Sequence, residues 1–422
     1  MVCRVSSLVI VLTTAFAVFA SGLEKYTATE RRHWAFQKRN HPEVPTFTTP
    51  QDRAWVKNPI DAFVLARLQK ESLRPAPKAD KVTLIRRAYF DLTGLPPSPA
   101  EVDAFVKDTR PVAWEKLIDK LLASAAYGER WGQHWLDVVR FSETDGYEYD
   151  THRADAWRYR DYVIQSLNSD KPYNQFIREQ LAGDEMAPNN EIARIAAGFQ
   201  RLGPVRKNAG NQEVASSRNE QLTEMTNIVG SAILGVTLGC ARCHDHKFDP
   251  IRHTDYYRMQ AFFAGTFEED VPLAGKAEQE AWKVKHEAWN SEMKALKEKM
   301  KTLEGDAKLQ MEKKLKDMEA LAPTPLPSLY SVKTDASKAT PIHVLARGDY
   351  QNKGEAVQTR PLGVLLPDEA PEWKVEKPRT ELANWILTDE HPLTARVIAN
   401  RIWLHHFGRG IVGTPNDFGR MG

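Results

Sequence analysis

The stretch Leu222–His244, LTEMTNIVGSAILGVTLGCARCH, decides the fold expected at the centre of this chain. Its apolar residues recur at three- and four-residue steps, at Met225, Ile228, Val229, Ala232 and Ile233. This is the period of an α-helix with one buried face. Gly239 predicts the end of the helix, because glycine is common just after helix C-termini. A buried helix would therefore lead directly into the motif Cys240-Ala241-Arg242-Cys243-His244.

The helical period extends to both sides of this stretch, and we expect a mainly α fold built as a helical array. Asn58-Pro59 predicts a helix start, since asparagine caps helices and proline fits their first turn. Apolar residues at helical spacing predict further helices at Val82–Leu92, Pro99–Val106, Ala113–Leu122 and Thr380–Phe407.

Two later segments depart from the array. Residues 276–322 are rich in lysine and glutamate, and their apolar residues form a coiled-coil-like seam that is broken at Gly305-Asp306. We expect a protruding helical hairpin there. Residues 325–370 contain the short β-prone runs Ile342–Leu345 and Leu362–Leu366 among turn residues, which predicts a small β-rich segment.

The composition limits the class of protein. With 422 residues, of which 42% are hydrophobic, the chain can bury a substantial core in two or three structural units. Its 58 basic residues nearly balance its 56 acidic residues, which leaves a formal net charge of +2. So small a charge creates no global field, and we expect no nucleic-acid partner.

Residues 1–20 have the pattern of a signal peptide. Arg4 supplies a positive charge, Leu8–Phe19 is apolar, and Val18-Phe19-Ala20 places small residues where a signal peptidase cuts. The apolar run is shorter than the roughly 20 residues that span a bilayer. We therefore expect an exported protein, periplasmic or at the cell surface, with no membrane span after cleavage.

The cysteines all point to one motif. Cys3 would leave with the signal peptide, so Cys240 and Cys243 are the cysteines of the mature chain. Two cysteines separated by two residues and followed by histidine are the attachment pattern of haem c, with two thioethers and His244 as proximal iron ligand. The alternatives are a local disulfide, or a zinc or non-haem iron site completed by His246 and His253.

The second axial ligand of a haem is left open by the sequence. Met259, His246 and His253 are the candidates, with Met225 as a further rival. A methionine ligand would favour electron transfer, whereas an open position would favour ligand binding or oxidative chemistry.

A second candidate site lies in the aromatic and charged region Glu129–Asp184. Catalytic acids and anion-binding arginines could come from Asp145, Glu148, Asp150, Arg153 and Arg158. Rings for stacking could come from Trp131, Trp135 and Trp157. The alternative interpretation is a buried network of arginine, acid and tryptophan that holds helices together.

Four stretches of this sequence resemble a known family. They are NPIDAF at Asn58–Phe63, RAYFDLTGLPP at Arg87–Pro97, ERWGQHWLD at Glu129–Asp137 and GCARCHDHKFDP at Gly239–Pro250. The chain resembles planctomycete secreted cytochrome c-like proteins, in which a planctomycete-specific cytochrome-type domain precedes a planctomycete-specific domain of unknown function. The resemblance implies a helical cytochrome-type domain at residues 58–267 and the start of the second, helical domain at residues 379–422, which we expect to be truncated.

Three functions follow as hypotheses, and the sequence leaves open whether the protein is an enzyme. The first is an exported c-type haem protein that exchanges electrons with a redox partner protein or a small-molecule substrate. The second is a carbohydrate-binding or carbohydrate-degrading module with a glycan substrate, in which the cysteine motif is structural or binds a non-haem metal. The third is a scaffold that contacts a partner through the 276–322 hairpin.

Overall fold

The computed structural model describes residues 25–146, 150–204 and 214–422. The fold is mainly α, with 56% of the chain in helices and two small antiparallel sheets, so the predicted fold class is confirmed. The predicted signal peptide at residues 1–20 and the candidate acid Glu148 lie outside the described residues. Among the described residues, no helix has the length and apolar character needed to cross a membrane.

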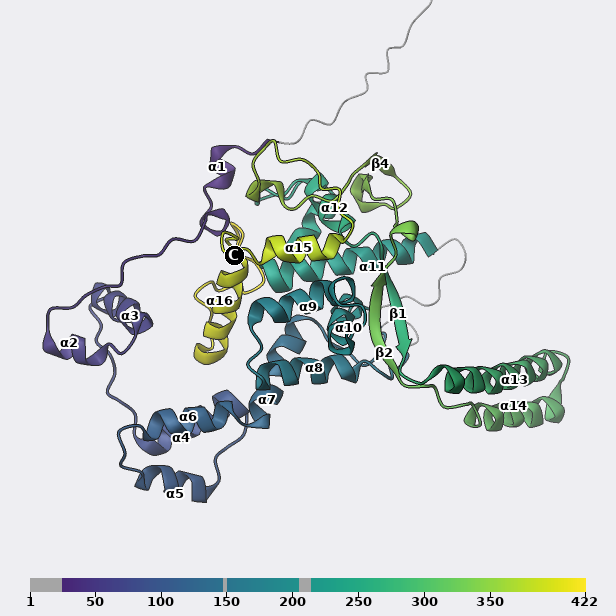
Figure 1. Ribbon diagram of the computed structural model, residues 1–422, viewed down its shortest axis with the longest axis horizontal. Helices are drawn as coiled ribbons and strands as arrows, with labels where there is room; N and C mark the ends of the chain where they lie inside the picture. Colours follow the sequence, from purple (N-terminus) through teal and green to yellow (C-terminus); the bar gives the residue numbers. More distant parts are fainter. Residues whose placement is uncertain (1–24, 147–149, 205–213) are drawn as a thin grey trace, which may run out of the picture.

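The amino-terminal part is a string of short helices, drawn in purple and blue in Figure 1. The Asn58 side chain accepts the Asp61 N–H and the Asp61 carboxylate accepts the Asn58 N–H, so the predicted start at Asn58-Pro59 is confirmed. Three of these helices, α4 to α6, share a small core of their own around Ile85, Leu92 and Leu117. The elements are α1 (Ala28–Arg31), the 3₁₀ turn η1 (Trp34–Phe36), α2 (Pro50–Trp55), α3 (Pro59–Lys70), α4 (Lys81–Thr93), α5 (Pro99–Lys107) and α6 (Ala113–Leu122).

The main body is a helical bundle around one large core, which contains the fully buried side chains of Tyr159, Ile177 and Phe263. Helices from the two halves of the chain contribute to it, and Figure 1 shows α15 lying beside α9. Its elements are α7 (Ala125–Val138), α8 (Trp157–Asn168), α9 (Tyr173–Met186), α10 (Glu191–Ala197), η2 (Gly198–Arg201), α11 (Val214–Ile228), η3 (Val229–Leu234), η4 (Leu238–Arg242), α12 (His253–Ala261), α15 (Pro378–Ile386) and α16 (Thr394–Phe407).

The predicted central helix is present but ends earlier than expected. Helix α11 continues as the π-helical turn η3 and stops at Gly235, whose φ of +60° ends it in the left-handed conformation. The prediction of Gly239 as the cap was wrong, because Gly239 lies in the next 3₁₀ turn, η4. Glycine adopts this conformation without a Cβ penalty, and α16 also leaves no room for a side chain there, since a Cβ at Gly235 would lie 2.6 Å from Cγ2 of Val397.

The hairpin at residues 276–322 is an insertion in a two-stranded sheet. Strand β1 (Thr266–Pro272) pairs antiparallel with β2 (Ser328–Thr334), with Pro272 opposite Ser328. Helices α13 (Lys276–Met300) and α14 (Gly305–Ala320) leave and return at that end, and Figure 1 shows them projecting from the body. Their small core of Met293, Leu296 and Leu315 is separate from the main one.

The predicted β-rich segment at residues 325–370 contains the strands β2, β3 and β4. Strands β3 (His343–Leu345) and β4 (Lys353–Ala356) form the second sheet, whereas Leu362–Leu366, expected to be β-prone, holds the 3₁₀ turn η7 (Gly363–Leu365). Two more 3₁₀ turns are present: η5 (Ala336–Lys338) precedes β3, and η6 (Ala346–Gly348) lies between β3 and β4.

The single helix expected at Thr380–Phe407 is two helices, α15 and α16, which the turn before Leu393 separates.

A buried ionic joint connects α15 to α9. Arg379 is fully buried, and its two terminal nitrogens donate to the two carboxylate oxygens of Asp184 at 2.8 and 2.6 Å. Glu185 accepts the backbone N–H and the hydroxyl of Thr380 at 2.8 and 2.9 Å. Because buried charges are tolerated only when they are paired, this joint fixes the position of α15.

Candidate functional site

The cysteine motif lies on the surface, where Cys240 belongs to η4 and Cys243 and His244 directly follow it. The Cys240 side chain is exposed, Cys243 is half-buried, and both thiols are free. The turn is anchored from beneath by Leu238 and Ala241, which are buried in the main core. Two accessible thiols are therefore presented on a loop with a fixed base.

One backbone carbonyl organises this cysteine loop. The Arg242 carbonyl accepts hydrogen bonds from His253 Nε2 at 2.9 Å and from the Tyr257 hydroxyl at 2.8 Å. The Asp245 carboxylate accepts the His253 backbone N–H at 2.8 Å. Both donors come from α12, so this helix holds the peptide between the two cysteines in place.

The β3–β4 turn covers the other side of the cysteine loop. Gly348, with a φ of +74°, approaches so closely that a Cβ there would lie 3.0 Å from Cys243 Sγ. The Gly348 carbonyl accepts a hydrogen bond from the Arg242 guanidinium at 3.2 Å. Glycine is needed at this position both for its backbone conformation and for the space left to the thiol.

His244 has the local geometry of a metal-binding imidazole. It is exposed, and its Nδ1 donates to the Asp245 carbonyl at 2.6 Å. Because a carbonyl oxygen only accepts, the proton sits on Nδ1 and the lone pair of Nε2 is available. Histidine ligands of metals commonly donate their other ring N–H to a carbonyl in this way.

The other four candidate iron ligands have structural contacts, and Met225 is buried in the main core. Met259 is fully buried in the main core. His246 accepts the Asp249 N–H at Nδ1 (2.9 Å), and its Nε2 lies 3.2 Å from the Thr237 hydroxyl. His253 donates to Arg242, as described above. Within the described ranges, no group of three or more His, Cys, Asp or Glu side chains has the arrangement of a metal site.

The candidate acids and arginines of the aromatic and charged region belong to separate contacts. Asp145 and Arg153 form a buried ion pair at 3.0 Å, and the Arg153 Nη atoms donate to the carbonyls of Arg201 and Gly203. Asp150 is exposed, and its carboxylate accepts the Gly146 N–H at 3.0 Å.

Arg158 approaches Asp155 at 3.5 Å and stacks over Trp157, with 4.5 Å between its guanidinium carbon and the ring centroid. These contacts join neighbouring parts of the chain.

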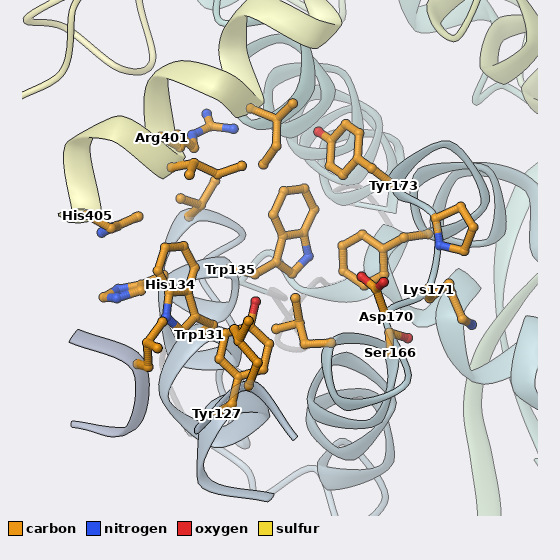
Figure 2. A pocket seen from close by; sticks show the side chains of 18 of the residues that line it. Tyr127, Trp131, His134, Trp135, Ser166, Asp170, Lys171, Tyr173, Arg401 and His405 are labelled. Carbon is orange, nitrogen blue, oxygen red and sulfur yellow. The ribbon is translucent and has the colours of Figure 1, made fainter. Parts of the chain in front are cut away.

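Two of the three candidate tryptophans of that region line a cavity instead, whereas Trp157 does not. A cavity of about 390 Å³ lies between α7, the α8–α9 turn and α16, and Figure 2 shows its walls. Trp131 and Trp135 line it, but Asp145, Asp150, Arg153 and Arg158 do not. Among the residues that the sequence did not single out are Tyr127, His134, Tyr173, Phe176, Arg401 and His405. A sequence signal for them is weak, because they come from helices more than 200 residues apart.

Two histidines stack at the edge of this aromatic cavity. The His134 and His405 rings lie 3.7 Å apart at 14°, and Trp131 meets both edge-on. Burial lowers the pKa of His134 to about 4, and it lowers the pKa of His405 as well, with nearby positive charges adding to the effect. The histidine pair is therefore uncharged at neutral pH, and the wall it forms is apolar in character.

Comparison with known families agrees with the motifs. Residues 59–268 match the family model PSCyt2, described as a protein of unknown function (DUF1549), and residues 378–422 match PSD1, described as a protein of unknown function (DUF1553). Searches of curated proteins and of solved structures found no match. The cysteine loop lies in the first matched region, and α15 and α16 lie in the second. The two matches, in this order, fit the planctomycete-specific pair of domains that the sequence motifs indicate.

Proposed function

We propose that this chain is an exported c-type haem protein that carries out electron transfer or redox chemistry in the periplasm. The observation that carries the proposal is the cysteine loop, which presents two free thiols and an available imidazole nitrogen at the surface within five residues. This is the order of groups that haem attachment requires. A haem bound through Cys240, Cys243 and His244 would supply a one-electron redox centre.

The chain's own residues support this role by holding the loop. His253 and Tyr257 fix the peptide between the cysteines through the Arg242 carbonyl. The Asp245 carbonyl keeps the proton of His244 on Nδ1, which directs Nε2 outward as the ligand atom. A metal ligand held in one tautomer binds more tightly than a freely rotating one.

The burial and hydrogen bonds of the other candidate ligands bear on which residue would bind the iron. Met259 is buried, and the His246 and His253 rings already have hydrogen-bond partners. His253 donates from one ring nitrogen to a backbone carbonyl, as His244 does, so this contact does not exclude it. We expect His244 to be the iron ligand because it directly follows Cys243 in the motif.

The test is expression with the cytochrome c maturation system, followed by an absorption spectrum and haem staining after denaturation. The wild-type chain should show a Soret band and haem that stays attached in the denaturing gel. Cys240→Ala and Cys243→Ala should each weaken the covalent link, and His244→Ala should change the spectrum. His41→Ala, at an exposed histidine far along the chain from the motif, is the matched control.

A wild-type chain without covalent haem in the periplasmic fraction would overturn the proposal. Metal analysis of the same sample separates the alternatives, because one zinc or iron per chain without haem would favour the non-haem metal site.

A further inference from the structure

We propose that the aromatic cavity between α7, the α8–α9 turn and α16 binds a planar aromatic carboxylate. The carboxylate would lie at Arg401 and Tyr173, and the aromatic ring along Trp135. The inference is independent of haem attachment, because it concerns a separate set of residues.

The cavity has the size and the lining of a small-molecule site. Its volume of about 390 Å³ falls within the roughly 300–1,000 Å³ typical of ligand pockets. Apolar and aromatic side chains form most of the wall, and a few polar groups converge on it, as in ligand sites generally.

The first of these polar groups is a buried guanidinium without a carboxylate partner. Arg401 is 3% exposed, and its terminal nitrogens donate to the carbonyls of Ser231 and Ala232 and to Asn416 Oδ1. Its Nε is buried and has no hydrogen-bond partner among the described residues.

Most of the other buried arginines have a carboxylate partner, which Arg401 lacks. Four of them are paired with carboxylates, namely Arg153, Arg201, Arg258 and Arg379. Of the described buried arginines, Arg401 and Arg360 lack such a pair, and of these two Arg401 lines the cavity. A buried positive charge favours an anionic ligand, because burial of an unpaired charge is costly.

The second polar group is the Tyr173 hydroxyl, which is buried and has no hydrogen-bond partner among the described residues. Figure 2 shows Tyr173 and Arg401 flanking the same end of the cavity, with the hydroxyl directed toward the Arg401 side. Two unpaired donors at one end of an apolar cavity would bind the two oxygens of a carboxylate.

The walls select an aromatic ring. Trp135 Nε1 already donates to Gln180 Oε1 at 2.9 Å, so its ring face is what it offers to a ligand. Phe176 meets Trp135 edge-on at 5.2 Å between ring centroids, and aromatic ligands extend such arrangements favourably.

The charged residues on the rim set the orientation of the ligand. Lys171 is paired with Glu179 at 2.5 Å, and Asp170 is exposed on the α8–α9 turn. A carboxylate would be repelled by Asp170 and attracted by Arg401, so it would lie at the Arg401 end.

The experiment is calorimetric titration of the full exported chain, as isolated, with 2-naphthoate. We expect saturable binding at one site, at least tenfold tighter than binding of the uncharged 2-naphthamide. Tyr173→Phe removes a hydroxyl that has no partner in the folded protein, so its melting temperature should not fall. Its affinity for 2-naphthoate should fall about tenfold or more, because a hydrogen bond to a charged group is lost.

Tyr256→Phe is the matched control, since Tyr256 is a fully buried phenol that does not line the cavity. It should bind 2-naphthoate as the wild type does. Any of three results would overturn the proposal: no saturable binding to the wild type, equal affinity for the acid and the amide, or unchanged affinity in Tyr173→Phe.

Discussion

The cysteine loop and the aromatic cavity are built in opposite ways. The loop comes from five consecutive residues and lies on the surface, where α12 and the Gly348 turn fix its backbone. The cavity takes its walls from α7 and α9 on one side and α16 on the other, and its lining ranges from buried Trp135 to exposed Ile402. The chemical groups of the loop therefore come from neighbouring residues in the sequence. The cavity exists only while residues 59–268 and residues 378–422 stay packed against each other.

The largest expected effect comes from breaking that docking. Arg379→Ala would leave the Asp184 and Glu185 carboxylates buried without their guanidinium. Loss of one partner from a buried ion pair costs about 3–5 kcal/mol, so urea denaturation should show a fall in unfolding free energy of that order. Arg110→Ala, which breaks an exposed pair with Asp108, should lower the unfolding free energy much less. Similar losses in the two variants would contradict a buried joint.

A smaller effect is expected from Gly348→Ala, which disturbs the cysteine loop. The left-handed backbone at φ +74° costs an alanine about 1–2 kcal/mol, and its Cβ would also press on Cys243 Sγ. Gly408→Ala is the matched control, because Gly408 has a φ of +77° and open space around its Cβ position. Thermal denaturation should show the greater loss in Gly348→Ala, and maleimide should label Cys243 at a changed rate in that variant alone. Equal losses would mean that the contact with the thiol has no cost.

Protonation of the stacked histidines should make the stability of the folded protein depend on pH. Between about pH 6.5 and 4 the unfolded chain protonates His134 while the folded chain does not, since its folded pKa is about 4. Stability should therefore fall as the pH falls through this window. In His134→Phe the melting temperature should depend less on pH between 7.5 and 4.5, with a remaining slope from buried His391, whose pKa burial lowers to about 3. His41→Phe is the control, and a slope unchanged in His134→Phe would refute this origin.

The smallest effect is expected from removing the α13–α14 hairpin, which belongs to neither site. Replacing residues 274–326 with Asn-Gly should close β1 onto β2 through a two-residue turn, because the Leu273 N–H already donates to the Pro327 carbonyl. The melting temperature and binding of 2-naphthoate should stay close to those of the full chain. A variant that aggregates or loses naphthoate binding would show that the hairpin supports the body. Retained partner association would argue against its use as a scaffold.

The sequence predicted the position of the cysteine loop but not the aromatic cavity, because the loop depends on neighbouring residues and the cavity on distant ones. Helix spacing, the Asn58-Pro59 start and the Cys240–His244 motif depend on residues close together in the chain. The role of the aromatic and charged region depended on distant contacts, and the structure separates its tryptophans from its acids. Gly239 was chosen as a helix cap on local chemistry, but the helix ends at Gly235, an earlier glycine with the same local signal that also lies close to Val397.

By itself, the sequence determined the mainly α class, the hairpin insertion and the position of the cysteine motif, because hydrophobic period and short motifs are local properties. The tertiary structure alone decided which histidines have structural contacts, which arginines find carboxylates and where a cavity opens. Those outcomes depend on how surfaces far apart in the chain exclude water together. Arg379 and Arg401 are the same residue type on neighbouring helices, yet the fold gives one a carboxylate partner and leaves the other facing a cavity.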